Sequence, residues 1–317
     1  MKKTKLGIVV PCYNEAAVID EAASKITEKL ALYMKENLIT KESKVIFIDD
    51  GSRDETWAKI VRWHVNSKYV NGVKLARNFG HQGALMAGLL TCRDSFDCII
   101  SMDADLQDDV DALRTFVQRY LEGNEIVYGV RRNRKTDSLF KKVTARLFYG
   151  LMRLIGVDLV ADHADYRLMS RKALHILSDF QESNLFLRGI VPMIGLQSSV
   201  IEYDRKKRAA GESKYPFRKM VAFAVDGITS FSIVPIRLIG FLGLVVIMVS
   251  IFSIVYSIFA KFGGAATPGW TSLFVSIWFL GGVQLVIIGL IGEYVGKVYK
   301  EVKRRPLFII DKTAIKE

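Results

Sequence analysis

The sequence predicts an α/β protein with a Rossmann-like, mostly parallel sheet, helices on both faces of that sheet, and a membrane-embedded C-terminal part. Two observations lead to this prediction. From residue 6 to residue 129, short apolar runs alternate with segments whose apolar residues recur at helical spacing. Between residues 238 and 292, Lys261 is the only charged residue.

Composition narrows the classes of function. The 317 residues carry a net charge of +12, which is compatible with nucleic acid, a membrane surface or phosphorylated substrates as partners. Hydrophobic residues make up 50% of the chain, and the apolar excess lies after residue 235. Cys12, Cys92 and Cys98 lack metal-site spacing, so we expect reduced packing residues in a cytosolic domain. A basic start leading directly into a strand predicts no signal peptide.

The expected elements alternate along the chain. Strands are expected at residues 6–11, 45–48, 70–75, 98–102 and 125–129, and intervening helices should end near residues 35, 64, 90 and 122. Later, we expect a helix near residues 171–177 and short strands near residues 201–203 and 307–310. Ligands of such sheets bind at the carboxyl ends of the strands. Four polar segments that follow strands should therefore converge: residues 11–15, 49–52, 77–83 and 103–107.

A pair of carboxylates ends the fourth strand. Asp103 and Asp105 are two residues apart, so they point to the same side if strand geometry persists. Their hard oxygens suit Mg²⁺ or Mn²⁺ that also contacts a diphosphate, and Gln107 adds a third oxygen. Taken alone, the pair is equally compatible with a solvated turn. The acidic first turn of the next helix accounts for the carboxylates that follow: Asp108, Asp109 and Asp111.

The phosphate-binding loops of other nucleotide folds are absent from the sequence. The first strand leads into P-C-Y-N-E rather than G-x-G-x-x-G, and no Walker A sequence is present. Phosphates must therefore be held by a metal and by basic side chains.

Basic and polar segments follow the α/β region. Residues 140–154 form an amphipathic basic helix, which lies either in a membrane interface or on the domain with a solvated basic face. Residues 162–168 form a non-periodic polar cluster with two acids, Asp162 and Asp165. The basic residues 205–214 form either a solvated surface or a mobile loop that closes on phosphates.

Two charge-free stretches, residues 238–260 and 262–292, are each long enough for a transmembrane helix, which needs ~20 residues. A buried soluble hairpin is the alternative. Basic residues flank both outer ends, so the positive-inside rule places both termini in the cytoplasm. The expected parts are a cytoplasmic catalytic domain, an interfacial helix, two spans with a short external loop, and a cytoplasmic tail: residues 1–215, 216–235, 236–296 and 297–317.

Six motifs, taken in order, resemble the family 2 glycosyltransferases of the GT-A fold. They are V-V-P-C-Y-N-E, D-D-G-S-R-D, R-N-F-G-H-Q, D-A-D-L-Q, A-D-Y-R-L-M-S-R and R-A-A-G-E-S-K-Y, starting at residues 9, 49, 77, 103, 164 and 208. Within that family the chain is similar to the polyprenyl-phosphate glycosyltransferases, which include dolichyl-phosphate mannose synthase and bacterial undecaprenyl-phosphate glucosyltransferases. Ala164 is a departure, since many relatives have glycine there.

The resemblance implies roles for individual residues. Asp165 is the expected catalytic base with Asp162 as its rival, although Asp165 could instead orient an arginine or the sugar. Metal ligands are expected at Asp103, Asp105 and Gln107. The nucleotide is expected to contact Pro11, Tyr13, Glu15, Asp50, Arg77, Asp103 and Ala104. Phosphates of the donor or lipid are expected to contact Arg131, Arg134, Arg208, Ser213 and Lys214.

The implied reaction is inverting transfer of a sugar from a nucleotide sugar to polyprenyl (undecaprenyl) phosphate, at the cytoplasmic leaflet of the inner membrane. UDP-glucose is the first choice of donor, followed by UDP-N-acetylglucosamine and GDP-mannose, and relatives suggest a homo-oligomer. A non-catalytic nucleotide-sugar-binding module is the alternative, against which the intact Asp103, Asp105, Gln107 and Asp165 argue. A processive synthase would need a Q-x-x-R-W run, which is absent. Nucleic acid is disfavoured because the basic residues cluster near the membrane segments.

Overall fold

The computed structural model describes residues 3–132, 163–180, 182, 185–204 and 269–315, together with scattered positions between 234 and 252. The chain divides into two compact units. The first contains Met1–Arg153, Asp158–Tyr215 and Arg305–Glu317, and the second contains Leu154–Val157 and Pro216–Arg304.

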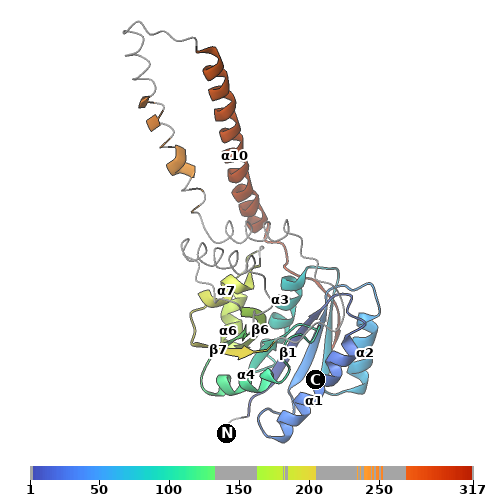
Figure 1. Ribbon diagram of the computed structural model, residues 1–317. Helices are drawn as coiled ribbons and strands as arrows, with labels where there is room; N and C mark the ends of the chain where they lie inside the picture. Colours follow the sequence, from blue (N-terminus) through green and yellow to red (C-terminus); the bar gives the residue numbers. More distant parts are fainter. Residues whose placement is uncertain are drawn as a thin grey trace. The chain divides into compact units, whose positions relative to one another are not determined.

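The first unit is built on an eight-stranded sheet, counted over the described residues (Figure 1). Its strand order is β7-β5-β6-β4-β1-β2-β3-β8. The strands are β1 (Leu6–Cys12), β2 (Lys44–Asp49), β3 (Val70–Leu75), β4 (Cys98–Ser101), β5 (Ile126–Arg131), β6 (His163–Ser170), β7 (Ser198–Tyr203) and β8 (Ile310–Ala314).

Helices cover both faces of this sheet, as predicted. The helices are α1 (Ile19–Lys35), α2 (Thr56–Asn66), α3 (His81–Cys92), α4 (Ala112–Leu121), α6 (Arg171–Ser178) and α7 (Leu187–Met193). Alternate residues of β1 face opposite sides, because side chains alternate along a strand. Leu6, Ile8 and Val10 join a core cluster with α1 and α4. On the other face, α3 packs so closely that a Cβ on Gly88 would lie 2.5 Å from Val9.

The sheet is mixed rather than simply parallel. Neighbouring strands β1 to β4 pair in parallel, but β6 runs antiparallel between β4 and β5. The interpretation of residues 162–168 as a non-periodic polar cluster is wrong for the part that forms β6. Residues 166–170 of this strand are buried and include Arg167, which is 1% exposed. A charged residue in this position is accommodated by pairing with Asp165, which local sequence does not reveal.

The end of the chain returns to the α/β unit. The backbone N–H of Ala76 donates to the carbonyl of Ile309 at 2.9 Å, and β8 then pairs antiparallel with β3 and forms one edge of the sheet. The predicted late strand at residues 307–310 therefore exists but begins later. Part of the segment assigned from sequence to a separate tail belongs to the sheet.

In the second unit, α10 (Trp270–Val302) contains one stretch, Phe279–Val302, that is long and apolar enough to cross a membrane. It is the only such helix among the described residues. The described positions between 234 and 252 are helical, but most of the first predicted span lies outside the described residues. The same holds for the amphipathic helix at 140–154 and the basic loop at 205–214, and for nearly all of the interfacial helix at 216–235. The first span remains a prediction.

Candidate active site

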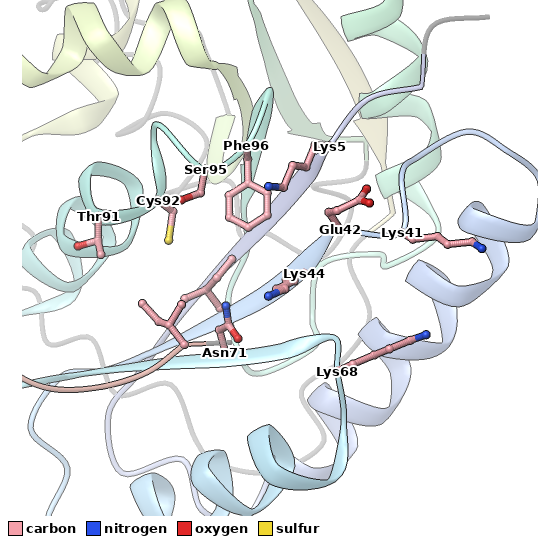
Figure 2. Close-up of a pocket in the computed structure, with 12 residues that line it drawn as sticks. Lys5, Lys41, Glu42, Lys44, Lys68, Asn71, Thr91, Cys92, Ser95 and Phe96 are labelled. Atoms are coloured by element: carbon pink, nitrogen blue, oxygen red, sulfur yellow. The ribbon is translucent and has the colours of Figure 1, made fainter. Parts of the chain in front are cut away.

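The four polar segments converge, as expected, on a cleft of about 430 Å³ at the carboxyl ends of β1, β2 and β4. Its described lining residues are Pro11, Cys12, Tyr13, Glu15, Asp50, Asn78, Gly80, His81, Ala84, Asp103, Ala104, Asp105 and Asp165. A cavity of about 490 Å³ lies at the opposite edge of the sheet, where Lys5, Lys44 and Lys68 come from the amino ends of β1 to β3 (Figure 2). None of the predicted site residues lines that second cavity.

Antiparallel pairing explains how Asp165 reaches this cleft. In the register of β4 and β6, Ile100 pairs with Leu168 and Ser101 with Arg167. Continuing that register by two residues places Asp103, beyond the carboxyl end of β4, across from Asp165, near the amino end of β6. His81, the first residue of α3, bridges the two: its Nε2 lies 3.7 Å from Asp103 Oδ1 and 3.5 Å from Asp165 Oδ2.

Asp50 fastens two of the converging segments together. Its Oδ1 accepts from the backbone N–H of Phe79 at 2.7 Å, and its Oδ2 accepts from that of Gly80 at 2.9 Å. Gly51 has a φ of +68°, and a Cβ there would lie 2.6 Å from the backbone carbon of Arg77. Asp50 is 3% exposed, and burial raises its pKa. The structural role of Asp50 is therefore to hold residues 78–80 at the cleft.

Arg77 lies outside the cleft, unlike most of the other residues expected to contact the nucleotide. Its guanidinium stacks on the ring of Phe79 at 4.1 Å, and Nη1 donates to the carbonyl of Asn78. Arg77 is exposed and is not among the described residues that line the cleft.

The carboxylates expected to hold a metal lie together in the cleft. Burial, together with the neighbouring carboxylates, raises the pKa of Asp103 to about 6, although the charge of His81 opposes this. Asp105 accepts from the backbone N–H of Gln107 across a tight turn, in which Leu106 has a φ of 52°. Gln107 itself is 6% exposed and is not among the described lining residues.

No three His, Cys, Asp or Glu side chains in the described part of the chain form a complete metal site. Two carboxylates that repel one another at a cleft do fit a divalent cation completed by water and substrate phosphate oxygens, which is the usual manner of Mg²⁺ binding. Asp103 and Asp105 would supply the protein's oxygens.

Asp165 lies among two arginines and a histidine. Its Oδ1 accepts from Arg167 Nη2 at 2.7 Å, and its Oδ2 lies 3.2 Å from Arg188 Nη2. Burial alone would raise the pKa of the Asp165 carboxyl. The hydrogen bond from His81 and the charges of Arg167 and Arg188 outweigh burial and hold that pKa well below its usual range.

Sequence reasoning gave no role to Arg167 or Arg188. The signal for Arg167 was its position two residues after Asp165 in a strand, because such residues face the same side. Arg188 lies on α7, far along the chain from Asp165, and only the fold brings the two together.

Arg131, expected to contact a phosphate, belongs to a largely buried polar cluster. It hydrogen-bonds Tyr203, whose hydroxyl donates to Asp108 Oδ1 at 2.6 Å. Asp108 is 2% exposed, so its interpretation as part of an acidic helix turn is wrong. The prediction failed because Tyr203, the hydrogen-bond partner of Asp108, lies on the distant strand β7. Five predicted site residues lie outside the described residues: Asp162, Arg134, Arg208, Ser213 and Lys214.

The mixed sheet and its acidic cleft define an α/β enzyme with a Rossmann-like GT-A sheet. Residues 7–177 match the model of glycosyl transferase family 2, and the chain belongs to that family. It is therefore a glycosyltransferase. An uncharacterized glycosyltransferase of Bacillus subtilis is 52% identical over 306 residues, covering 96% of this chain and 91% of the relative.

Two further relatives carry more specific names. A prophage-derived bactoprenol glucosyl transferase of Shigella flexneri is 38% identical over 311 residues, with 98% of each chain covered. A prophage bactoprenol glucosyl transferase homolog of Escherichia coli is 37% identical over 308 residues, covering 96% of this chain and 98% of the relative.

Solved structures resemble the chain more remotely. A mannosyl-3-phosphoglycerate synthase from Rubrobacter xylanophilus is 17% identical with a TM-score of 0.47, covering 70% of this chain and 71% of that one. The mannosyltransferase PcManGT from Pyrobaculum calidifontis, in complex with GDP-Man and Mn²⁺, is 17% identical with a TM-score of 0.43, covering 96% and 88%. The family assignment rests on the sequence matches.

Proposed function

We propose that this glycosyltransferase moves a glucosyl group from UDP-glucose to a polyprenyl phosphate, of the undecaprenyl type, with inversion at the sugar. The structural observation that supports it most directly is the juxtaposition of Asp103 and Asp165 in one cleft, with two arginines bound to Asp165. Paired carboxylates at one side suit a metal-held diphosphate, and cations at the other suit an anionic acceptor. The bactoprenol glucosyl transferases that match almost the whole chain support this choice of acceptor and sugar.

On the donor side, Asp103 and Asp105 would hold Mg²⁺ or Mn²⁺, which when bound neutralises negative charge on the leaving nucleoside diphosphate. The nucleotide would lie against Pro11, Tyr13 and Glu15, which line the same cleft. Asp50 contributes by fixing residues 78–80 beside it. Pre-organised walls of this kind lower the cost of orienting a bound substrate.

On the acceptor side, the nucleophile is an oxygen of a phosphate monoester. Its second pKa is about 6, so at neutral pH it is already mostly ionised and has little need of a general base. An efficient general base has a pKa near the working pH. Asp165 has a pKa well below the usual value, so it is a weak proton acceptor. We therefore assign Asp165 mainly to positioning the groups around it.

The membrane segments would keep the enzyme where its acceptor lies. The apolar stretch in α10, with the predicted first span at residues 238–260, would anchor the chain with both termini in the cytoplasm. Confinement to the bilayer raises the effective concentration of a lipid acceptor.

The test uses membranes from cells expressing the full chain, incubated with one radiolabelled donor at a time: UDP-glucose, UDP-N-acetylglucosamine or GDP-mannose. We expect label from UDP-glucose in an organic-extractable product that mild acid releases as glucose. Membranes with Asp103→Asn serve as the control for other enzymes. Label from a different donor would reassign the sugar, and no lipid product from any donor would reject the proposed function.

A further inference from the structure

Arg188 is an exposed cation held at the edge of the active site. It is the second residue of α7, and its Nη2 and Nε lie 3.2 Å and 3.5 Å from the two oxygens of Asp165. Its side chain remains 39% exposed. Arg167, which shares the same carboxylate, is 1% exposed and also donates to the carbonyl of Leu187 at 3.2 Å. That hydrogen bond fixes the residue immediately before Arg188.

The carboxylate of Asp165 is shared between two arginines. Asp165 supplies one negative charge to two guanidinium groups, both permanently protonated. Arg167 makes the shorter contact and is the more deeply buried of the two arginines, so it is the main partner of the carboxylate. Arg188 is left as surplus positive charge at a surface that water and a ligand can reach. An exposed ion pair stabilises a fold only weakly, which makes a purely structural role a poor explanation for this arrangement.

The guanidinium also has donors to spare. It carries five N–H groups in a planar fork, and the contacts with Asp165 use the side formed by Nε and Nη2. Among the described residues, Nη1 of Arg188 makes no hydrogen bond. A guanidinium restrained on one side and open on the other matches the geometry of a phosphate group, to which it donates two parallel hydrogen bonds.

The placement of Arg188 distinguishes it from a donor ligand. The contacts run from Asp103 through His81 to Asp165, and Arg188 comes after Asp165 in this series. Asp103 and Asp105 mark the position of the donor diphosphate. A cation that contacts Asp165, rather than the carboxylates expected to hold the metal, is suited to the second anion of the proposed reaction.

We propose that Arg188 binds the phosphate monoester of the lipid acceptor and that Asp165 is the positioning residue that aims it. This inference rests on the proposed function, because it assumes that the acceptor is a phosphate. It gives Asp165 a task that needs its charge and its position but no proton transfer. The arrangement also gives the buried Arg167 a function. It binds Oδ1 of Asp165 from inside the protein, so that Oδ2 is presented to Nη2 of Arg188.

The test compares Arg188→Ala and Arg188→Lys with wild type, using undecaprenyl phosphate and UDP-glucose as the substrates. Loss of a charge-assisted hydrogen bond corresponds to roughly a 10- to 100-fold effect on binding. We expect Arg188→Ala to raise the KM for undecaprenyl phosphate by about that factor while leaving the KM for UDP-glucose within about twofold. Arg188→Lys keeps the charge but loses the fork, so its acceptor KM should lie between the two.

Two controls accompany these variants. Arg171→Ala removes an arginine with a similar exposure, 44%, that pairs with Asp97 away from the cleft, and it should leave both KM values unchanged. In the double variant Asp165→Asn/Arg188→Ala, the acceptor KM should be no higher than in Arg188→Ala alone, because a positioning residue has nothing left to position. Arg188→Ala leaves Asp165 paired with Arg167, so we expect its unfolding temperature to stay near that of wild type.

The possible outcomes separate the inference from its alternatives. A rise in the donor KM with the acceptor KM unchanged would place Arg188 on the diphosphate and overturn the inference. Unchanged KM values for both substrates in an active enzyme would make the ion pair structural and overturn it as well. If the wild type makes no lipid-linked product, the proposed function and this inference fail together. An active wild type with an unaffected Arg188→Ala rejects the inference alone.

Discussion

Replacing Asp165 with asparagine removes one negative charge while nearly preserving shape, so it separates a base from a positioning residue. The amide oxygen can still accept from Arg167 Nη2, which lies 2.7 Å from Asp165 Oδ1 in the wild type. What disappears is the charge that holds Arg188 and the capacity to take a proton. An essential base would cost ~10²- to 10⁴-fold in rate when lost.

If Asp165 positions Arg188, the loss in single-turnover rate at saturating acceptor should be less than about 10²-fold. That loss should stay nearly constant from pH 6 to pH 8, because ionisation of the acceptor phosphate, with a second pKa of about 6, affects wild type and variant alike. The assay is the single-turnover rate of glucosyl transfer for wild type and Asp165→Asn across that range, with donor binding measured separately. A loss of several orders of magnitude at pH 6 that shrinks as the pH rises to 8, with donor affinity unchanged, would refute the positioning role and make Asp165 the base.

The same variant should lower stability. Removing the partner of a buried charge typically costs roughly 3–5 kcal/mol, and Arg167 would keep its charge with only an amide beside it. The pKa of Asp165 is lower in the folded protein than in the unfolded chain, so its ionised form stabilises the fold above about pH 4. That contribution is lost as the pH falls through the folded-state pKa. The difference in unfolding temperature between wild type and Asp165→Asn should therefore be constant from pH 8 to pH 5 and narrow only in stronger acid.

Three further predictions concern the rest of the site and the membrane topology. Asp105→Ala should abolish divalent-dependent transfer, and full activity of that variant in EDTA-treated membranes would contradict the metal role. Asp50→Ala removes the acceptor for two backbone N–H groups at 2.7 and 2.9 Å. This variant should raise the KM for UDP-glucose. It should also lower the unfolding temperature, because each backbone N–H left without a hydrogen-bond acceptor costs about 1–3 kcal/mol. An unchanged KM would show that residues 78–80 do not contribute to binding of UDP-glucose. A reporter fused after Glu317 should be cytoplasmic, and a signal from the other side of the membrane would reverse the orientation inferred from charge.

The strands that the sequence predicted well are those whose burial is complete and whose residues are apolar. Residues 6–11, 45–48 and 98–102 are short apolar runs, and each lies in or overlaps a central strand of the sheet. Their polar ends predicted the convergence of four loops, because parallel strands end at one edge of a sheet. Both predictions depend on local pattern and a general rule of topology.

The missing parts depend on pairing over long distances. β6 carries Asp165 and Arg167, and each would cost free energy in a buried strand without the other. Read singly, they predict a surface loop. Asp108 looked like part of an acidic helix turn until Tyr203, from a strand near residue 200, supplied its hydrogen bond. Arg188 lies beside Asp165 only because β6 brings that carboxylate to the cleft.

The antiparallel strand β6 resolves a problem that the proposed reaction poses. Two anions, a nucleoside diphosphate and a phosphate monoester, would have to approach each other in one cleft, and the charged residues that line it after the parallel strands β1, β2 and β4 are all carboxylates. Because β6 runs the other way, its amino end meets the carboxyl end of β4, and it introduces Asp165 together with the arginines bound to it. A carboxylate between two anion sites would ordinarily repel both. Here Arg167 pairs with that charge from inside the protein, and Arg188 and His81 contact its other oxygen, Oδ2. Asp165 can then orient cations toward the acceptor without opposing its approach, which is a role that a free carboxylate in the same position could not perform.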